Sequence, residues 1–213
     1  MGNARRAALE EWAGWWAMTP QPASLTQSVL PGVLTALGWQ GCQVVTVRAL
    51  STLRVVVCEL DEPEHARRQK AGLIPTADAL LLHCRAHVAP SFLQRPSPVR
   101  IRGAVAVRAS WRSARANLAG FAAFGARVAV LPAKVAHRDA VRAESIYHGF
   151  GLLAAEKPQE VIQAPDAYVS VERTWAHRLV EEIVYDALLS QQTVQRRDLG
   201  SQAFMKAGGS QVR

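Results

Sequence analysis

Residues 100–131, RIRGAVAVRASWRSARANLAGFAAFGARVAVL, decide the fold. The first part, RIRGAVAVRAS (100–110), ends in a continuous run of small apolar residues, which predicts a central strand covered on both faces. Ser110 is a suitable N-cap for a helix over 111–124, which Gly125 ends. RVAVL (127–131) predicts a second buried strand. This order of strand, helix and strand indicates the α/β class, with α+β as the alternative.

The residues before this stretch add a helix and more strands. A helix is expected from Ser24 to about Leu37, although Pro31 would lie in its interior, where proline costs about 3 kcal/mol. The β-branched residues of 44–47 and 53–60 predict a hairpin. Residues 61–70 are polar and predict a short exposed helix or loop. The apolar run ADALLLHC (77–84) has the length of a strand.

The residues after it continue the alternation of helices and strands. We expect a helix over 137–148, a strand over 150–155, a brief extended piece over 161–164 and a helix over 174–191. The fold is then a mixed central sheet of about five strands flanked by helices, with a C-terminal helix packed across it. The predicted domain organisation is an N-terminal helical segment (1–23), a single α/β domain (24–195) and a flexible tail (196–213).

Composition indicates a folded globular protein in a reducing compartment. The chain is 49% hydrophobic and 20% charged. Its three cysteines, Cys42, Cys58 and Cys84, are widely spaced, which argues against a disulfide framework. No apolar run reaches the roughly 18 residues of a membrane span. We therefore expect a cytoplasmic protein with no membrane partner.

Positive charge is concentrated in the middle third of the chain. Between Ala79 and Arg138 there are ten basic residues and no Asp or Glu, whereas the other 15 of the 25 Lys and Arg are balanced by all 17 acidic residues. The net charge of +8 therefore arises in this stretch. Clustered basic residues are typical of a polyanion-binding surface, and nucleic acid is the first candidate.

The residues expected to contact nucleic acid are mostly arginines, whose planar guanidinium groups suit phosphate oxygens. Few Asn or Gln accompany them, so the sequence indicates contacts to the backbone rather than to base edges. Trp111, between Arg108 and Arg112, has two alternative roles: it stacks on a base, or it is the first core anchor of its helix. The full predicted set is Arg100, Arg102, Arg108, Trp111, Arg112 and Arg115, with Arg127 and Lys134 as outer contacts.

Across residues 24–157 the order of predicted elements is similar to the core of the PD-(D/E)XK, or restriction-endonuclease-like, superfamily. The resemblance implies a divalent metal held by an Asp on one strand and by a Glu-x-Lys on the next. Asp78 occupies the position of that Asp, whereas Ala106 and Arg108 replace the Glu and the Lys. Alanine cannot bind a metal and arginine stays charged, so the resemblance implies a core that has lost its catalytic motif.

Three functions follow as expectations. The first is backbone-directed binding of DNA, or less readily RNA, without catalysis and without a cofactor. The second is a Mg²⁺- or Mn²⁺-dependent nuclease in which Asp78 is helped by Glu59 or Asp61. The third is a protein-interaction module, in which the basic middle third docks an acidic protein partner or a second copy of the chain and the apolar C-terminal helix forms the contact.

Overall fold

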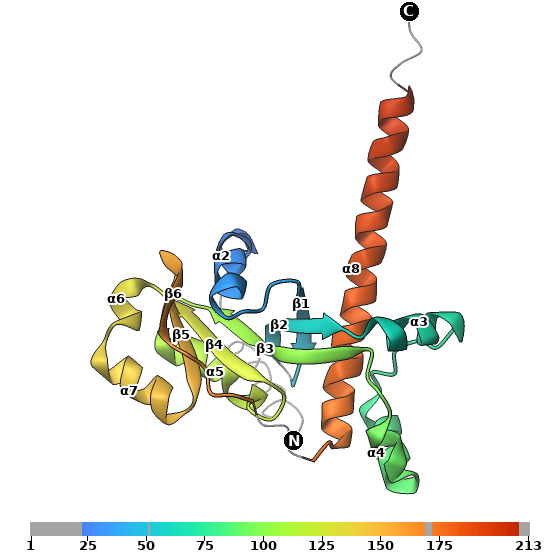
Figure 1. Cartoon of the computed structure of the whole chain (residues 1–213), viewed down its shortest axis with the longest axis horizontal. Helices are drawn as coiled ribbons and strands as arrows, with labels where there is room; N and C mark the ends of the chain where they lie inside the picture. The colour runs from blue at the N-terminus through green and yellow to red at the C-terminus, as the bar shows by residue number, and fades with distance from the viewer. Residues whose placement is uncertain (1–22, 51, 169–171, 209–213) are drawn as a thin grey trace, which may run out of the picture.

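The computed structural model describes residues 23–50, 52–168 and 172–208, which form a six-stranded mixed sheet flanked by helices (Figure 1). The predicted α/β class is therefore confirmed, with six strands where about five were expected. The strands are β1 (Gln43–Ala49), β2 (Thr52–Leu60), β3 (Val99–Val107), β4 (Ala126–Leu131), β5 (Phe150–Ala154) and β6 (Lys157–Gln163). The α-helices are α2 (Ala23–Ala36), α3 (Glu62–Lys70), α4 (Ala79–Val88), α5 (Trp111–Leu118), α6 (Ala133–Ala136), α7 (Asp139–Tyr147) and α8 (Trp175–Gly208), with short 3₁₀ turns η1 (Pro90–Gln94) and η2 (Ala119–Phe121).

The strands lie side by side in the order in which they occur along the chain. β1, β2 and β3 form an antiparallel meander, β3, β4 and β5 are parallel, and β6 is antiparallel to β5. Because β1 and β3 are both antiparallel to β2, β1 runs in the same direction as β3, β4 and β5. The carboxyl ends of these four strands therefore meet at one edge of the sheet, the carboxyl edge, and their amino ends at the opposite amino edge.

Helices cover both faces of the sheet and create two apolar clusters. On one face α5, α6, α7 and α8 pack over residues such as Val45, Val56 and Ala106. On the other face α2 packs through Val29 and Val33 against the parallel strands. Residues 103–107 of β3 are buried throughout, which explains their uniformly apolar sequence.

Gly103 allows β3 to be approached closely from two sides. A Cβ atom there would lie 2.5 Å from the carbonyl oxygen of Ala126 and 2.8 Å from Cη2 of Trp39. Only glycine leaves room for both the neighbouring strand and the tryptophan ring. Trp39, directly after α2, is thereby positioned on the sheet.

Two predicted elements are observed with shifted limits. The helix expected over 24–37 is α2, which continues through Pro31; the exposed face of the helix carries this proline, and Gly38, with φ of +68°, follows the helix. The extended piece expected over 161–164 belongs to β6, which begins at Lys157. As an edge strand, β6 tolerates Pro158 and its charged neighbours.

The strand predicted over 77–84 is wrong, because these residues form the loop into α4 and most of α4 itself. Asp78 is the N-cap, and its Oδ1 accepts a hydrogen bond of 2.9 Å from the backbone N–H of Leu81. Leucine and alanine favour a helix once such a cap is present.

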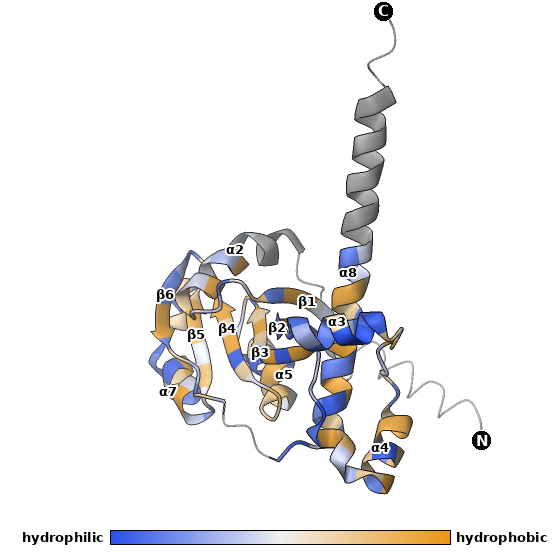
Figure 2. Cartoon of the chain, turned by 45° about the vertical axis from the view of Figure 1, so that its right-hand side comes forward, coloured by the Kyte–Doolittle hydropathy of each residue, from blue (hydrophilic) through white to orange (hydrophobic). Residues whose placement is uncertain are grey.

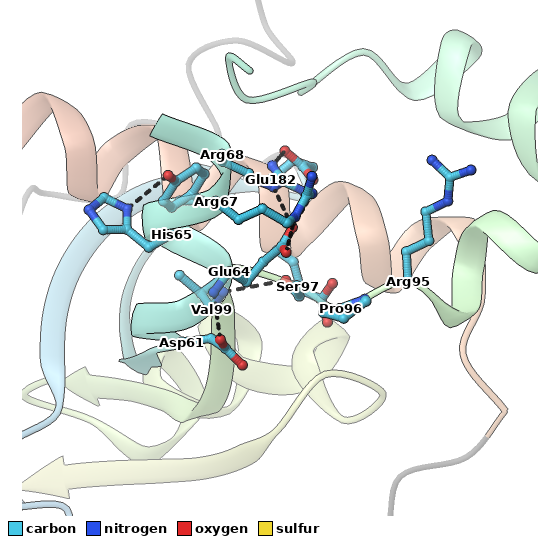
Figure 3. A network of polar contacts seen from close by, with 12 residues as sticks. Asp61, Glu64, His65, Arg67, Arg68, Arg95, Pro96, Ser97, Val99 and Glu182 are labelled. Atoms are coloured by element: carbon cyan, nitrogen blue, oxygen red, sulfur yellow. Dashed lines mark hydrogen bonds and ion pairs between the residues drawn. The ribbon is translucent and has the colours of Figure 1, made fainter. Parts of the chain in front are cut away.

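The polar stretch 61–70 consists of α3 and its N-cap residue, and the inner side of this helix carries charges rather than apolar groups. Asp61 caps the helix by accepting from Glu64 N–H at 3.0 Å. Glu64 and Arg68 are both buried, so the prediction of a fully exposed segment is wrong for these two residues. Arg68 donates to Glu64 at 3.1 Å and to both carboxylate oxygens of Glu182 of α8 at 2.8 and 2.9 Å (Figure 3).

Glu182 is the centre of this buried charge network. Besides Arg68, it accepts a bond of 3.0 Å from the backbone N–H of Thr76. Nε of Arg178 lies 3.0 Å from Glu182 Oε1, but not in hydrogen-bonding geometry. Arg178 donates instead through Nη1 to the carbonyl of Pro96 at 3.0 Å. The network thus ties α3, residue 76 and the segment before β3 to α8.

The carboxylates of the network stay ionised despite burial. Burial alone would raise the pKa of Glu182, but the bonds from Arg68 and Thr76 and the nearby charge of Arg178 lower it overall. The pKa of Glu64 falls to about 2, chiefly because Arg67 hydrogen-bonds its carboxylate, with Arg68 adding to the effect.

α8 packs across the sheet with its first half and extends beyond it with its second half (Figure 1). Val180, Val184 and Leu188 are buried against the core that contains β1. The apolar stripe of this helix is therefore used within the chain. Helix continues to Gly208, where the sequence predicts a flexible tail from residue 196. Within the described residues, no helix has the length and apolar character needed to cross a membrane.

The buried network predicts a large loss of stability in Glu182→Gln. Arg68 and Arg178 would remain buried without their carboxylate, so the free energy of unfolding should fall by about 3 kcal/mol or more. Urea denaturation measures this loss. As a control, Glu160→Gln removes one partner of the exposed pair with Lys157 and should change stability by less than about 0.5 kcal/mol.

The lowered pKa of Glu64 predicts that the free energy of unfolding decreases at low pH. Its pKa in the folded chain, about 2, lies below its ordinary value of 4.5, so it stabilises the fold above pH 4.5, and this contribution is lost as pH falls towards 2. Glu64→Gln should lower the free energy of unfolding at neutral pH by about 2 kcal/mol and flatten its decline in acid. Glu62→Gln, on the exposed side of the same turn, should keep the decline of the parent protein.

Candidate nucleic-acid interface

The fold divides the predicted basic residues between the two edges of the sheet. Arg108, Arg112 and Lys134 follow the ends of β3 and β4 at the carboxyl edge. Arg100, Arg102 and Arg127 lie near the starts of the same strands, at the amino edge. At about 3.3 Å per residue, β3 separates Arg100 from Arg108 by roughly 26 Å. The basic stretch of the sequence is therefore not one continuous surface.

At the carboxyl edge, the turn from β3 to α5 positions Arg108 and Arg112. The backbone N–H of Arg108 donates to Val130 O at 3.0 Å, and its Nη1 donates to Val107 O at 3.0 Å. Burial lowers the pKa of Arg108 below its ordinary value. Ser110 caps α5, and Arg112 points from the first turn of this helix into solvent.

Two further arginines join this edge. Arg48 is exposed near the end of β1, which runs in the same direction as β3. Arg138 is the exposed N-cap residue of α7, which follows β4 through α6. Arg48 was not predicted from the sequence as part of the site. The sequence predicted the hairpin of β1 and β2 but not the pairing of β2 with β3, which places the end of β1 at the carboxyl edge. Arg138 was counted as basic but was not assigned to the site.

Within the part of the chain that the structure describes, the exposed cations of the carboxyl edge lack ion pairs. Among the described residues, no salt bridge involves Arg48, Arg112, Lys134 or Arg138. The acidic residues next to these strand ends are Asp139 and Glu156. Glu156 accepts the backbone N–H of Ala133 at 2.8 Å. The edge therefore carries an excess of positive charge.

The amino edge is different, because two of its arginines, Arg102 and Arg173, already face carboxylates. A β-bulge between β2 and β3 leaves Arg102 as an extra residue, and its Nε donates to Glu59 at 2.7 Å. Arg173 is bound to Glu181 at 2.6 Å. The two arginines and Glu181 line a cleft of about 710 Å³, which also contains Asp61, Asp166, Arg100, His177 and the rings of Trp39, Phe124 and Tyr168. Charge of both signs is balanced in this cleft.

Arg127 is held beside this cleft by its own fold contacts. Its guanidinium lies 4.3 Å from the centroid of the Phe150 ring and hydrogen-bonds the carbonyl of His148. Burial lowers its pKa, and the nearby Asp166 opposes the shift. These contacts occupy the guanidinium of Arg127, which the sequence predicted as an outer contact to nucleic acid, and make it less available to a ligand.

Trp111 is a core anchor and not a stacking platform. Only 8% of the residue is exposed, and its ring packs edge-on against Phe150 with centroids 5.3 Å apart. Its Nε1 donates to Glu144 Oε2 at 2.7 Å. The same oxygen accepts from Arg115 Nη1 at 2.8 Å, so Arg115 is also paired. These contacts favour the core-anchor role of Trp111 over the stacking role.

The acidic residues considered for a metal site do not come together. Asp78 caps α4, which packs against α8. Glu59, on β2, pairs with Arg102 of β3, and Asp61 caps α3. Across the described ranges, no group of three His, Cys, Asp or Glu side chains has a metal-binding arrangement. Asp78, Glu59 and Asp61 therefore do not form a site that fits a divalent ion.

Trp111→Leu tests the anchor role. The loss of the ring and of its bond to Glu144 should lower the free energy of unfolding by about 2 to 4 kcal/mol. Affinity for an oligonucleotide, measured by fluorescence anisotropy well below the melting temperature, should not change. Weaker binding at unchanged stability would restore the stacking role.

Comparison with known proteins assigns no family to the chain. No protein-family model, no curated protein and no solved structure matches it. The likeness to the PD-(D/E)XK superfamily therefore stays a prediction from the order of elements.

Proposed function

We propose that this protein binds nucleic acid, DNA in preference to RNA, through the phosphate backbone and without cleaving it. The contact surface is the carboxyl edge of the sheet. The observation that carries the proposal is the gathering there of exposed cations without salt-bridge partners among the described residues; these are Arg48, Arg112, Lys134 and Arg138, with Arg108 behind them.

Cations without an ion pair contribute most to the binding free energy of a polyanion. A phosphate that replaces water and counterions around Arg112 or Lys134 releases those ions to bulk solvent, which favours binding entropically. A phosphate at Arg102 would first compete with Glu59, whose oxygen already lies 2.5 Å from Nη2. An unpaired arginine of the carboxyl edge therefore contributes more to phosphate binding than a paired arginine of the amino edge.

The spacing of the cations suits a backbone rather than a single anion. β1, β2, β3 and β4 are consecutive in the sheet, so Arg48 and the residues after β4 are separated by three strand spacings, or about 14 Å. Cations spread over such a distance meet successive phosphates of a strand. No Asn or Gln belongs to the set, which agrees with binding that depends little on sequence.

Two variants with equal loss of charge test the assignment. Arg112→Ala combined with Lys134→Ala should weaken binding of a labelled duplex and of a single strand by roughly tenfold or more. The slope of log affinity against log salt concentration should become shallower by about two, one for each lost phosphate contact. The control, Arg100→Ala combined with Arg102→Ala, removes the same charge from the amino edge and should have a clearly smaller effect.

The opposite ranking of the two double variants would move the interface to the amino-edge cleft. Absence of salt-sensitive binding in the parent protein would reject nucleic acid altogether. The same samples incubated with Mg²⁺ or Mn²⁺ test for cleavage. Products that disappear in Asp78→Ala would establish the alternative nuclease.

A further inference from the structure

α4 presents its apolar side to solvent. Leu82 is fully buried, whereas Leu80 is 73% and Val88 is 82% exposed, and Leu81 and Cys84 are exposed as well. A helix in a globular protein ordinarily turns its apolar stripe towards the core. Here one leucine suffices for anchoring, and the stripe on the other side has no partner in the described part of the chain.

The exposed residues form one continuous stripe. At roughly 100° per residue, Leu80, Leu81, Cys84 and Val88 fall on one side of the helix, and Leu82 and Ala86 on the other. The preceding loop adds Leu73, 49% exposed, and Ile74, 82% exposed. Of the ten large apolar residues that are exposed in the described ranges, five lie within residues 73–88. Figure 2 shows the hydrophobic colouring along α4, beside α8.

The stripe is held rigidly and contains no charge. Asp78 caps the helix, and His83 packs edge-on against Trp175 of α8 with ring centroids 5.3 Å apart. Arg85 is drawn aside, since its guanidinium lies 5.6 Å from the centroid of the Phe92 ring. Exposed apolar surface of this extent on a fixed element marks an interaction site.

We propose that the α4 stripe is the contact between two copies of this chain, which pack their α4 helices antiparallel across a two-fold axis near Cys84. The stripe is self-complementary about this residue, because Leu80 and Val88 lie four residues to either side. Leu80 of one copy then packs on Val88 of the other, as an isologous interface requires.

Electrostatics favour the same arrangement. Antiparallel helices place the N-terminus of one α4, with its capping carboxylate Asp78, beside the C-terminal turn of the other, which carries His87. Arg85, held on Phe92, stands outside the seam. Two short helices and their preceding loops form an interface at the small end of the known range, so we expect reversible dimerisation with a dissociation constant on the order of micromolar.

Light scattering and sedimentation of the full chain across a range of concentrations test the dimer. The mass should rise from 23.2 kDa towards twice that value as concentration increases. Leu80→Asp combined with Val88→Asp should abolish the rise, since each charge would be buried without a partner. The control Tyr147→Asp changes a residue that is 85% exposed on α7 and should dimerise like the parent protein.

Oxidative cross-linking tests the position of the axis. Cys84 is exposed, whereas Cys58 is buried and its thiol pKa is raised to about 12 by burial, and Cys42 is partly buried with a raised pKa. Mild oxidation should therefore link two chains through Cys84, and Cys84→Ser should abolish the product.

Three results would overturn the proposal. These are a monomer at every concentration, a dimer that survives the double aspartate substitution, or a monomer that binds anionic vesicles through the stripe. The proposal is independent of nucleic-acid binding, because the double aspartate variant leaves every cation of the carboxyl edge in place.

Discussion

One carboxylate, that of Glu182, ties α3, the loop before α4 and the segment before β3 to α8. Arg68 brings α3 to it, Thr76 brings the loop before α4, and Arg178 links the same point to the segment that enters β3. Apolar burial is non-directional and would permit several positions of these segments. A buried carboxylate must be matched by particular donors, and Glu182 thereby holds the loop before α4 at Thr76.

The inner strands of the sheet were predictable because they contain continuous apolar runs, such as AVAV of β3 and VAVL of β4. ADALLLHC contains a similar run, ALLL, but no β-branched residue, and Asp78 lies directly before that run as a cap. Those two signals favour a helix, but the run also has the length of a strand, and the prediction followed its length. The buried pair of Glu64 and Arg68 was not predictable, since its partner Glu182 is 114 residues away in the sequence.

The candidate site shows the same limit. The count of charges along the chain located the net positive charge in the middle third. Basic residues that are close in this sequence nevertheless lie at opposite ends of the strands, and so at opposite edges of the sheet. Arg102 and Arg115 are neutralised by Glu59 and Glu144, which lie outside the basic stretch. Arg48 joins the carboxyl edge only through the direction of β1. Such relations require the topology, which residue types and spacing do not determine.

The order of the sheet has a consequence for how the chain acquires its structure. Every strand pairs with its neighbours in sequence, so the sheet can grow from β1 to β6 in the direction of synthesis, and most pairings close short loops at little entropic cost. The contacts of α8 with β1 and of α2 with β6 are exceptions, since they join opposite ends of the domain. We expect α8 to dock last, so that the apolar face containing Val45 and Val47 is the surface a chaperone would encounter on the nascent chain.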